Sequence, residues 1–236
     1  MTEHHTMIAS LHPGLRLFLR HAPAQRKSAT PPVLYVHGAT FPSALSIAHR
    51  FDGLSWEDDL AASGFDVWSF DFHGFDRSDP FPEMAQPADA NPPLGATPDG
   101  AAQIERAARF ILKQSGTPSL SIVAHSWGTI AAGLFASRFP ELVDRLVFFG
   151  PITPRDGGKA AVLPAWGEVT LDDQWRRFVA DVPAGEAPVL SRSHFADWGA
   201  RYLASDNGSA GRSPPAVRVP NGPRQGIADA WAGKLG

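Results

Sequence analysis

The sequence predicts an α/β fold in which helices flank a mostly parallel sheet. Between Val33 and Phe149, short apolar runs typical of buried strands alternate with longer segments whose apolar residues recur at helical spacing. This alternation implies right-handed crossovers between parallel strands. A chain of 236 residues with 43% hydrophobic and 19% charged residues is long enough for one domain of this kind and has an ordinary globular composition.

The elements of the first 150 residues can be assigned in chain order. The turn pair Pro13-Gly14 separates two strand-like runs and predicts a β-hairpin. Ser55 is a favoured helix N-cap, and we expect Gly64 and Gly116 to end helices. The predicted elements are a hairpin over 7–11 and 15–21, a strand over 33–36, a helix over 55–63, a strand over 66–70, an irregular proline-rich loop over 79–98, a helix from 97 to 116, a strand that ends at 126, a helix over 127–138 and a strand over 145–149.

The most informative stretch is the end of the strand that contains Ile122 and Val123. It stops at Ser126, helix-forming residues follow, and the small residues Ala124 and Gly128 stand two positions before and two after the serine. A serine on a sharp strand-to-helix turn between small residues is the pattern of a nucleophile elbow. The first small position is usually glycine, so this turn differs from the common form by one methyl group.

This elbow predicts two catalytic features. It should project the Ser126 hydroxyl from the C-terminal edge of the sheet, and it should aim the backbone N–H of Trp127 at the place where an oxyanion forms. The alternative is that Ser126 only caps the helix that follows, because serine is a favoured N-cap.

A second oxyanion donor is expected from the turn after the strand 33–36. Gly38 permits unusual backbone angles there, and the Ala39 N–H is the first candidate donor, with Thr40 second. A plain strand-exit turn is the alternative. His37 and His73 are expected at the rim of the pocket in structural hydrogen-bonding roles. The residues predicted to line the substrate pocket are His37, Gly38, Thr40 and His125.

Three segments in order carry a family resemblance, namely His37-Gly38-Ala39, Asp71 to Ser78, and Ala124 to Gly128. On these segments, residues 33–150 resemble the core of the α/β-hydrolase family. In that family the middle segment usually reads Gly-x-Gly-x-Ser, and here Asp76 stands in place of the second glycine. The resemblance implies a serine hydrolase for a carboxylic ester or related small-molecule acyl substrate, with no cofactor or metal. Acyl transfer and C–C bond hydrolysis fit the same motifs.

Residues 151–236 are expected to form a helical cap beside the core of residues 1–150. Helix starts are predicted near Thr170 and Ser193, with a third helix over 225–234. Glycine, proline and serine dominate the connecting segments, and no strand-like run is expected. The family resemblance implies that such a cap roofs the active site and sets substrate choice.

A serine nucleophile needs a base and an orienting carboxylate. The resemblance implies that these follow the cap, on strands that we do not find before Gly236. The chain is therefore expected to be a truncated hydrolase with weak or no turnover. Asp156 with His194 is the best substitute pair, but His194 falls in helical cap sequence. A non-catalytic binding or assembly module on the same scaffold is the alternative function.

Composition argues against several other classes. A formal net charge of −3 gives no basic surface for nucleic acid or for an anionic membrane, and the lack of cysteine excludes disulfides and thiolate metal sites. No signal peptide or membrane-spanning run is recognisable, so we expect a cytoplasmic protein. An incomplete sheet would leave one open edge, through which the chain is expected to self-associate.

Overall fold

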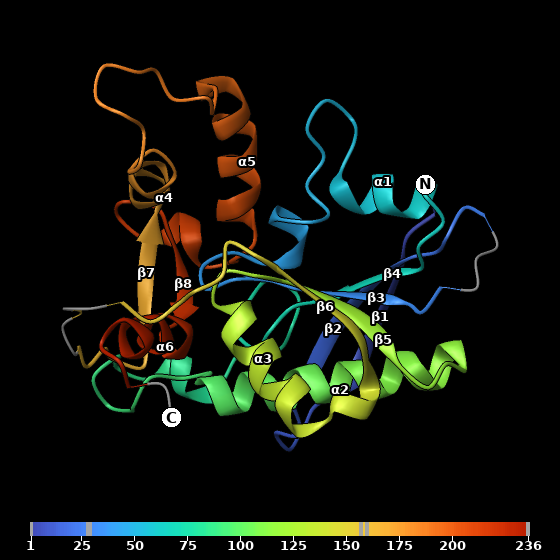
Figure 1. Cartoon of the computed structure of the whole chain (residues 1–236). Helices are drawn as coiled ribbons and strands as arrows, with labels where there is room; N and C mark the ends of the chain where they lie inside the picture. Colours follow the sequence, from blue (N-terminus) through green and yellow to red (C-terminus); the bar gives the residue numbers. More distant parts are fainter. Residues whose placement is uncertain (1, 27–29, 156–157, 159–160, 235–236) are drawn as a thin grey trace.

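The computed structural model describes residues 2–26, 30–155, 158 and 161–234. Its centre is a six-stranded sheet in the order β1-β2-β4-β3-β5-β6, with helices on both faces (Figure 1). The strands are β1 (His4–Ala9), β2 (Arg16–Ala22), β3 (Val33–Val36), β4 (Val67–Phe70), β5 (Leu120–His125) and β6 (Val143–Phe149). The pairs β4–β3, β3–β5 and β5–β6 are parallel, which confirms the predicted mostly parallel sheet, and the hairpin β1–β2 pairs antiparallel with β4.

Helices cover both faces of this sheet because the central strands are apolar on both sides. All four residues of β3 are buried. The core helices are α1 (Trp56–Ala62), α2 (Thr97–Ser115) and α3 (Gly128–Arg138). In Figure 1, α2 and α3 lie together on one face and α1 lies on the other. Short 3₁₀ turns are η1 (Ser43–Leu45), η2 (Pro82–Ala85), η3 (Pro140–Leu142) and η4 (Ser209–Gly211).

The predicted helix ends follow from their capping residues. The Ser55 hydroxyl accepts a hydrogen bond from the Asp58 N–H, and the Asp58 carboxylate accepts one from the Ser55 N–H, each at 3.0 Å. This reciprocal capping box fixes the start of α1. Gly116 takes a left-handed φ of 69° and ends α2, as expected of a C-terminal glycine.

The segment after β6 contains strands as well as helices, so the prediction that it lacks strands was wrong. Its elements are β7 (Trp166–Thr170), α4 (Leu171–Phe178), α5 (Arg192–Ala204), β8 (Ala216–Pro220) and α6 (Gly222–Trp231), which group together at one end of the sheet (left in Figure 1). β7 and β8 form their own antiparallel pair. Val217 and Val219 are buried on either side of Arg218, whose guanidinium lies 3.6 Å from the centre of the Trp166 ring. This alternation is the strand signal that the sequence contained.

Two helices of this segment begin earlier than predicted. Ser191, rather than Ser193, caps α5, because its hydroxyl accepts the His194 N–H at 3.1 Å. α6 begins at Gly222 with Pro223 in its first turn, a position where the missing N–H of proline costs nothing.

β6 is the last strand of the main sheet within the described residues, and it pairs only with β5. The exposed fractions of its last four side chains are 38% for Leu146, 51% for Val147, 42% for Phe148 and 58% for Phe149. Among the helices that the structure describes, none combines the length and the apolar character needed to cross a bilayer.

Candidate functional site

Ser126 occupies the turn between β5 and α3 with a φ of +55°, in the left-handed region. Its N–H donates to the Phe149 carbonyl at 3.0 Å, and its carbonyl accepts the Thr129 N–H at 2.9 Å. A non-glycine residue in this region costs of order 1–3 kcal/mol, so the surrounding bonds must hold the turn. The N-cap of α3 is Trp127, and no side-chain bond caps this helix. Ser126 is therefore not a plain helix cap.

The small residues beside the serine differ in how strictly the structure requires them. A Cβ atom on Gly128 would lie 2.5 Å from the His37 carbonyl oxygen and 2.9 Å from that of Val36, so only glycine fits there. Ala124 is fully buried, and its methyl group is accommodated inside the core. The close approach that requires a small residue is therefore at Gly128, after the serine, and not at Ala124, before it.

The turn that follows β3 packs directly against the elbow. A Cβ atom on Gly38 would lie 3.1 Å from the Ser126 Cβ and 3.3 Å from the His125 Nδ1. The φ of Gly38 is not left-handed, so our expectation that it supplies unusual backbone angles was wrong. Glycine is needed here because the serine lies so close. In the described chain, neither the Ala39 N–H nor the Trp127 N–H donates a hydrogen bond.

His37 lies beneath this turn. Its ring is fully buried, its Nδ1 contacts the Gly38 carbonyl oxygen at 2.8 Å, and its Nε2 accepts the Phe72 N–H at 3.0 Å. Burial lowers the pKa of His37 to about 3, so the ring is neutral, and its Nδ1–H donates to Gly38. We predicted that His37 lines the substrate pocket, but its ring is buried in the core. Through its two hydrogen bonds, the ring ties the Gly38 turn to the segment after β4.

His125 borders a cavity of about 340 Å³, which we call the apolar cavity. Its walls are mainly aromatic, and they include Tyr35, Phe41, Trp56, Phe149, Phe178 and Trp198. The His125 Nδ1 is buried and has no hydrogen-bond partner in the described chain. Burial, together with the charge of Arg177, lowers the pKa of His125, which favours the neutral ring. This cavity suits an apolar group.

A second cavity, of about 510 Å³, borders the two residues that follow Gly38, and we call it the arginine cavity. Ala39 and Thr40 line it from the core, and Arg177 and Arg224 line it from α4 and α6. The Thr40 hydroxyl is buried and lacks a hydrogen-bond partner among the described residues. The predicted oxyanion donor and two cations therefore share one recess.

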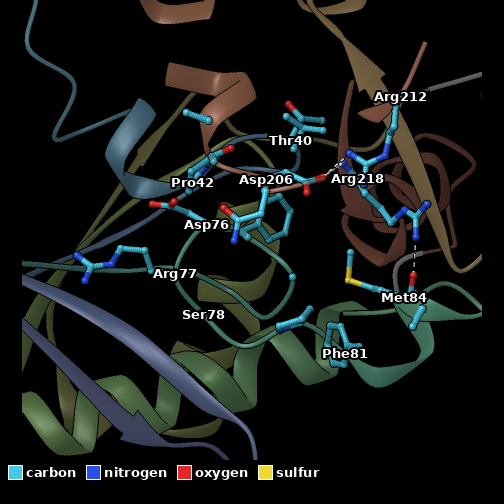
Figure 2. Close-up of a pocket in the computed structure, with 18 of the residues that line it drawn as sticks. Thr40, Pro42, Asp76, Arg77, Ser78, Phe81, Met84, Asp206, Arg212 and Arg218 are labelled. Carbon is cyan, nitrogen blue, oxygen red and sulfur yellow. Dashed lines mark hydrogen bonds and ion pairs between the residues drawn. The ribbon is translucent and has the colours of Figure 1, made fainter. Parts of the chain in front are cut away.

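A third cavity, of about 760 Å³, lies between residues 74–85 and the segment that leads into β8, and we call it the β8 cavity. Figure 2 shows two of its arginines paired with protein groups: Arg212 contacts Asp206 at 2.6 Å, and Arg218 donates to the Met84 carbonyl at 2.8 Å. Asp76, in the position of the usual glycine, has a φ of +43°. Aspartate tolerates this region better than most residues, which explains the substitution.

No acid or base contacts the serine hydroxyl within the described chain. His194, on α5, lies 3.5 Å from the Asp52 carboxylate and packs edge-on against Phe51, with ring centres 5.5 Å apart. Its partners belong to the loop before α1, and none is part of the elbow. Asp156, the other half of the substitute pair, lies outside the described residues. In the part of the chain that the structure describes, no group of three or more His, Cys, Asp or Glu could hold a metal ion.

Comparison with known proteins gives matches of the same architecture. A family described as the alpha/beta hydrolase fold matches residues 31–225. A thioesterase domain from the curacin biosynthetic pathway is 18% identical with a TM-score of 0.53, over 85% of this chain and 66% of that domain. An epoxide hydrolase from Vigna radiata is 13% identical with a TM-score of 0.54, over 97% of this chain and 72% of that enzyme. At such identities the likeness concerns the fold alone. No curated protein matches the sequence.

Proposed function

Because the chain belongs to the α/β-hydrolase family, we propose that it is a serine hydrolase that cleaves a carboxylic ester or a related acyl substrate. Ser126 is the nucleophile, and the N–H groups of Ala39 and Trp127 form the oxyanion hole. The observation that carries this assignment is the left-handed φ of +55° at Ser126, held beside a turn whose N–H groups the fold leaves unused. Strained backbone of this kind is found at functional sites.

The chemistry follows from these positions. The Ser126 oxygen bonds to the carbonyl carbon as its proton passes to a water molecule, and the carbonyl oxygen becomes an anion that the two N–H groups bind. Collapse of this intermediate breaks the bond to the alcohol or thiol, which leaves with a proton from water, and a second water then hydrolyses the acyl-enzyme and restores the serine hydroxyl. One oxyanion donor contributes about 3 kcal/mol to such a step. The described residues place no base at the serine hydroxyl, so we expect slow turnover from this chain alone.

The apolar cavity supports an acyl substrate. It lies on the His125 side of the elbow, and its walls are almost entirely carbon. Burial of an apolar chain contributes about 0.8 kcal/mol for each methylene group. We assign the hydrocarbon part of the substrate to this cavity.

A fluorophosphonate probe tests the nucleophile, because it forms a covalent bond with activated serines. We expect one adduct, mapped by mass spectrometry to the peptide that contains Ser126 and lost in Ser126→Ala. Ser137→Ala is the matched control, since this serine lies on the exposed side of α3 and its hydroxyl is bonded to the Leu134 carbonyl. Labelling that persists undiminished in Ser126→Ala would remove the assignment.

The second candidate is a binding module that keeps the hydrolase scaffold without turnover. The lack of an acid or base at the hydroxyl, within the described residues, favours it. Hydrolysis of p-nitrophenyl butyrate separates the two functions. Turnover that disappears in Ser126→Ala excludes the binding module, whereas a folded protein with neither turnover nor probe labelling excludes the hydrolase.

A further inference from the structure

The arginine cavity holds two cations that no carboxylate pairs with in the described chain. Arg177 donates to the neutral Oε1 of Gln174 at 2.8 Å, and its guanidinium lies 5.6 Å from the ring centre of Phe41. Arg224 donates to the neutral Oδ1 of Asn221 at 3.2 Å. Each guanidinium has five N–H donors, so most of them remain available. Both side chains remain accessible from the cavity.

The acidic residues that border this cavity are already engaged elsewhere. Glu168 contacts Arg212 at 3.0 Å and Arg218 at 3.1 Å. Asp173 accepts the Thr170 N–H at the start of α4 and contacts Arg176 at 2.6 Å. The two free arginines therefore give the recess a local excess of positive charge.

Both arginines are exposed to solvent, and each can reach a ligand in the recess. Partial burial of the Arg177 side chain lowers the pKa of its guanidinium, and the charge of Arg224 lowers it further. A bound anion would offset both effects, and a guanidinium fork matches the oxygens of a carboxylate or a phosphate.

The recess also reaches the turn after β3. Ala39, whose N–H we assign to the oxyanion hole, borders the same cavity as Arg177. The buried Thr40 hydroxyl, which has no hydrogen-bond partner in the described chain, is a further donor. Phe41 and Phe178 lie between the arginine cavity and the apolar cavity, because the Arg177 guanidinium is 5.6 and 5.4 Å from their ring centres.

We propose that the substrate carries an anionic group, a carboxylate or a phosphate, which Arg177 and Arg224 bind while the carbonyl lies at the Ala39 turn. The position of the carbonyl rests on the function proposed above. The substrate class is thus an acyl compound with an apolar part on one side of the carbonyl and an anion on the other.

The β8 cavity is a weaker anion site, although three arginines border it. Arg212 and Arg218 there are already paired with Asp206 and Glu168. An anion that binds there would have to break these ion pairs. In the arginine cavity it would break none, because no carboxylate pairs with Arg177 or Arg224 in the described chain.

The test measures equilibrium binding in Ser126→Ala, so that turnover plays no part. Monomethyl glutarate, dimethyl glutarate and inorganic phosphate are titrated into the protein and followed by NMR. Monomethyl glutarate has one carboxylate and one ester, and dimethyl glutarate is its neutral match. We expect the monoester to bind at least about tenfold more tightly than the diester, since a hydrogen bond to a charged group contributes that much. Phosphate that binds more tightly than the monoester would identify a phosphorylated substrate.

Substitutions in the same Ser126→Ala background locate the anion. We expect Arg177→Gln and Arg224→Gln each to weaken monoester binding roughly tenfold, and Arg177→Lys to weaken it less, because it keeps the charge and loses the fork. Arg201→Gln on α5 is the matched control, because Arg201 is exposed and pairs with Asp197 at 3.5 Å. Unfolding curves identify any variant that fails to fold. Because the two arginines lie on different helices, misfolding of one variant leaves the other as a test.

The outcomes separate this proposal from the hydrolase assignment. Equal binding of monoester and diester, or loss in Arg201→Gln equal to that in Arg177→Gln, overturns the anion site and leaves the serine assignment standing. Selective monoester binding without probe labelling of wild-type Ser126 supports the anion site and removes the hydrolase.

Discussion

Gly38 stands so close to Ser126 that a Cβ atom added to it would lie 3.1 Å from the Cβ of the serine. The contact joins the turn after β3 to the elbow after β5, two turns that lie almost ninety positions apart in the sequence. Ala39 and Trp127, whose N–H groups we propose as oxyanion donors, are the next residues in these two turns. A single methyl group at Gly38 should therefore disturb the proposed oxyanion hole.

Gly38→Ala is expected to move the turn away from the elbow. A contact of 3.1 Å is tighter than ordinary packing, and overpacking of this kind costs roughly 1–3 kcal/mol. Displacement of an oxyanion donor should also slow probe labelling of Ser126 by roughly tenfold to a hundredfold. Urea unfolding and the rate of fluorophosphonate labelling measure the two effects.

Gly133→Ala on α3 is the control for this change. A Cβ atom on Gly133 would meet its nearest neighbour, in Phe148, at an ordinary 3.8 Å, so alanine should stabilise the helix by about 0.5–1 kcal/mol. If Gly38→Ala is as stable and as reactive as Gly133→Ala, the close approach of Gly38 to Ser126 contributes neither to stability nor to reactivity.

The stability of the protein should depend on pH through Asp71. Its Oδ1 accepts bonds from Ser43, the N–H at 2.8 Å and the hydroxyl at 2.7 Å, while its Oδ2 is buried without a partner in the described chain. Burial, and then the charge of Asp76, raises the pKa of Asp71 to about 7. A folded pKa above the unfolded value means that the stabilisation is complete at acidic pH and is lost as the pH rises towards 7.

Asp71→Asn should remove this dependence, because the amide does not titrate. The unfolding free energy of the variant, relative to wild type, is expected to rise between pH 5 and pH 8 by about 3 kcal/mol. Buried histidines such as His37 titrate in both proteins and cancel in the difference. Urea unfolding at the two pH values gives the measurement, and a difference that stays constant with pH contradicts the expectation.

The open edge of β6 predicts self-association. Its unpaired backbone and exposed apolar side chains form a template on which the same strand of a second copy can pair. We propose this contact between two copies and expect Val147→Lys, at a position 51% exposed, to weaken it. Sedimentation velocity over a range of concentrations measures the change.

Val162→Lys is the matched control for the strand edge. Val162 is 94% exposed and lies outside the sheet, so the substitution adds the same charge to the surface without touching β6. A wild-type protein that stays monomeric at high concentration, or equal effects of the two lysines, rules out pairing through β6.

Local signals explain why much of the core could be predicted. The helix caps, the apolar run of β3 and the serine turn each depend on a few neighbouring residues. Those bonds form within the segment itself, as the Ser55–Asp58 capping box shows. The need for glycine at position 38 was also predicted, but for the wrong reason, because the close approach of Ser126 comes from a distant strand.

Long-range packing explains what the sequence did not indicate. β7 becomes a strand by pairing with β8, fifty residues further along the chain at Glu168 and Arg218. Arg177 was part of an ordinary amphipathic helix in the sequence, and Arg224 fell in a segment predicted to be a connector. Only the docking of α4 and α6 brings the two guanidinium groups to one cavity.

The Trp127 side chain connects the elbow to α6. Its indole is almost fully buried between two glycines: a Cβ atom on Gly100 would lie 2.7 Å from it, and one on Gly226 would lie 2.8 Å from its Nε1. No flexible side-chain end is available to move aside at either position. The two helices therefore approach the residue after Ser126 as closely as their backbones allow.

Gly226→Ala should push α6 away from Trp127, at a cost of roughly 1–3 kcal/mol in unfolding free energy. Arg224 lies two residues earlier on the same helix, so its guanidinium should leave the position that binds the anion. We therefore expect weaker binding of monomethyl glutarate, although no ligand contact is removed. Gly211→Ala is the control, because a Cβ atom there meets nothing within 4 Å. Equal stability and equal binding in the two variants would show that α6 is not held in place by its contact with Trp127.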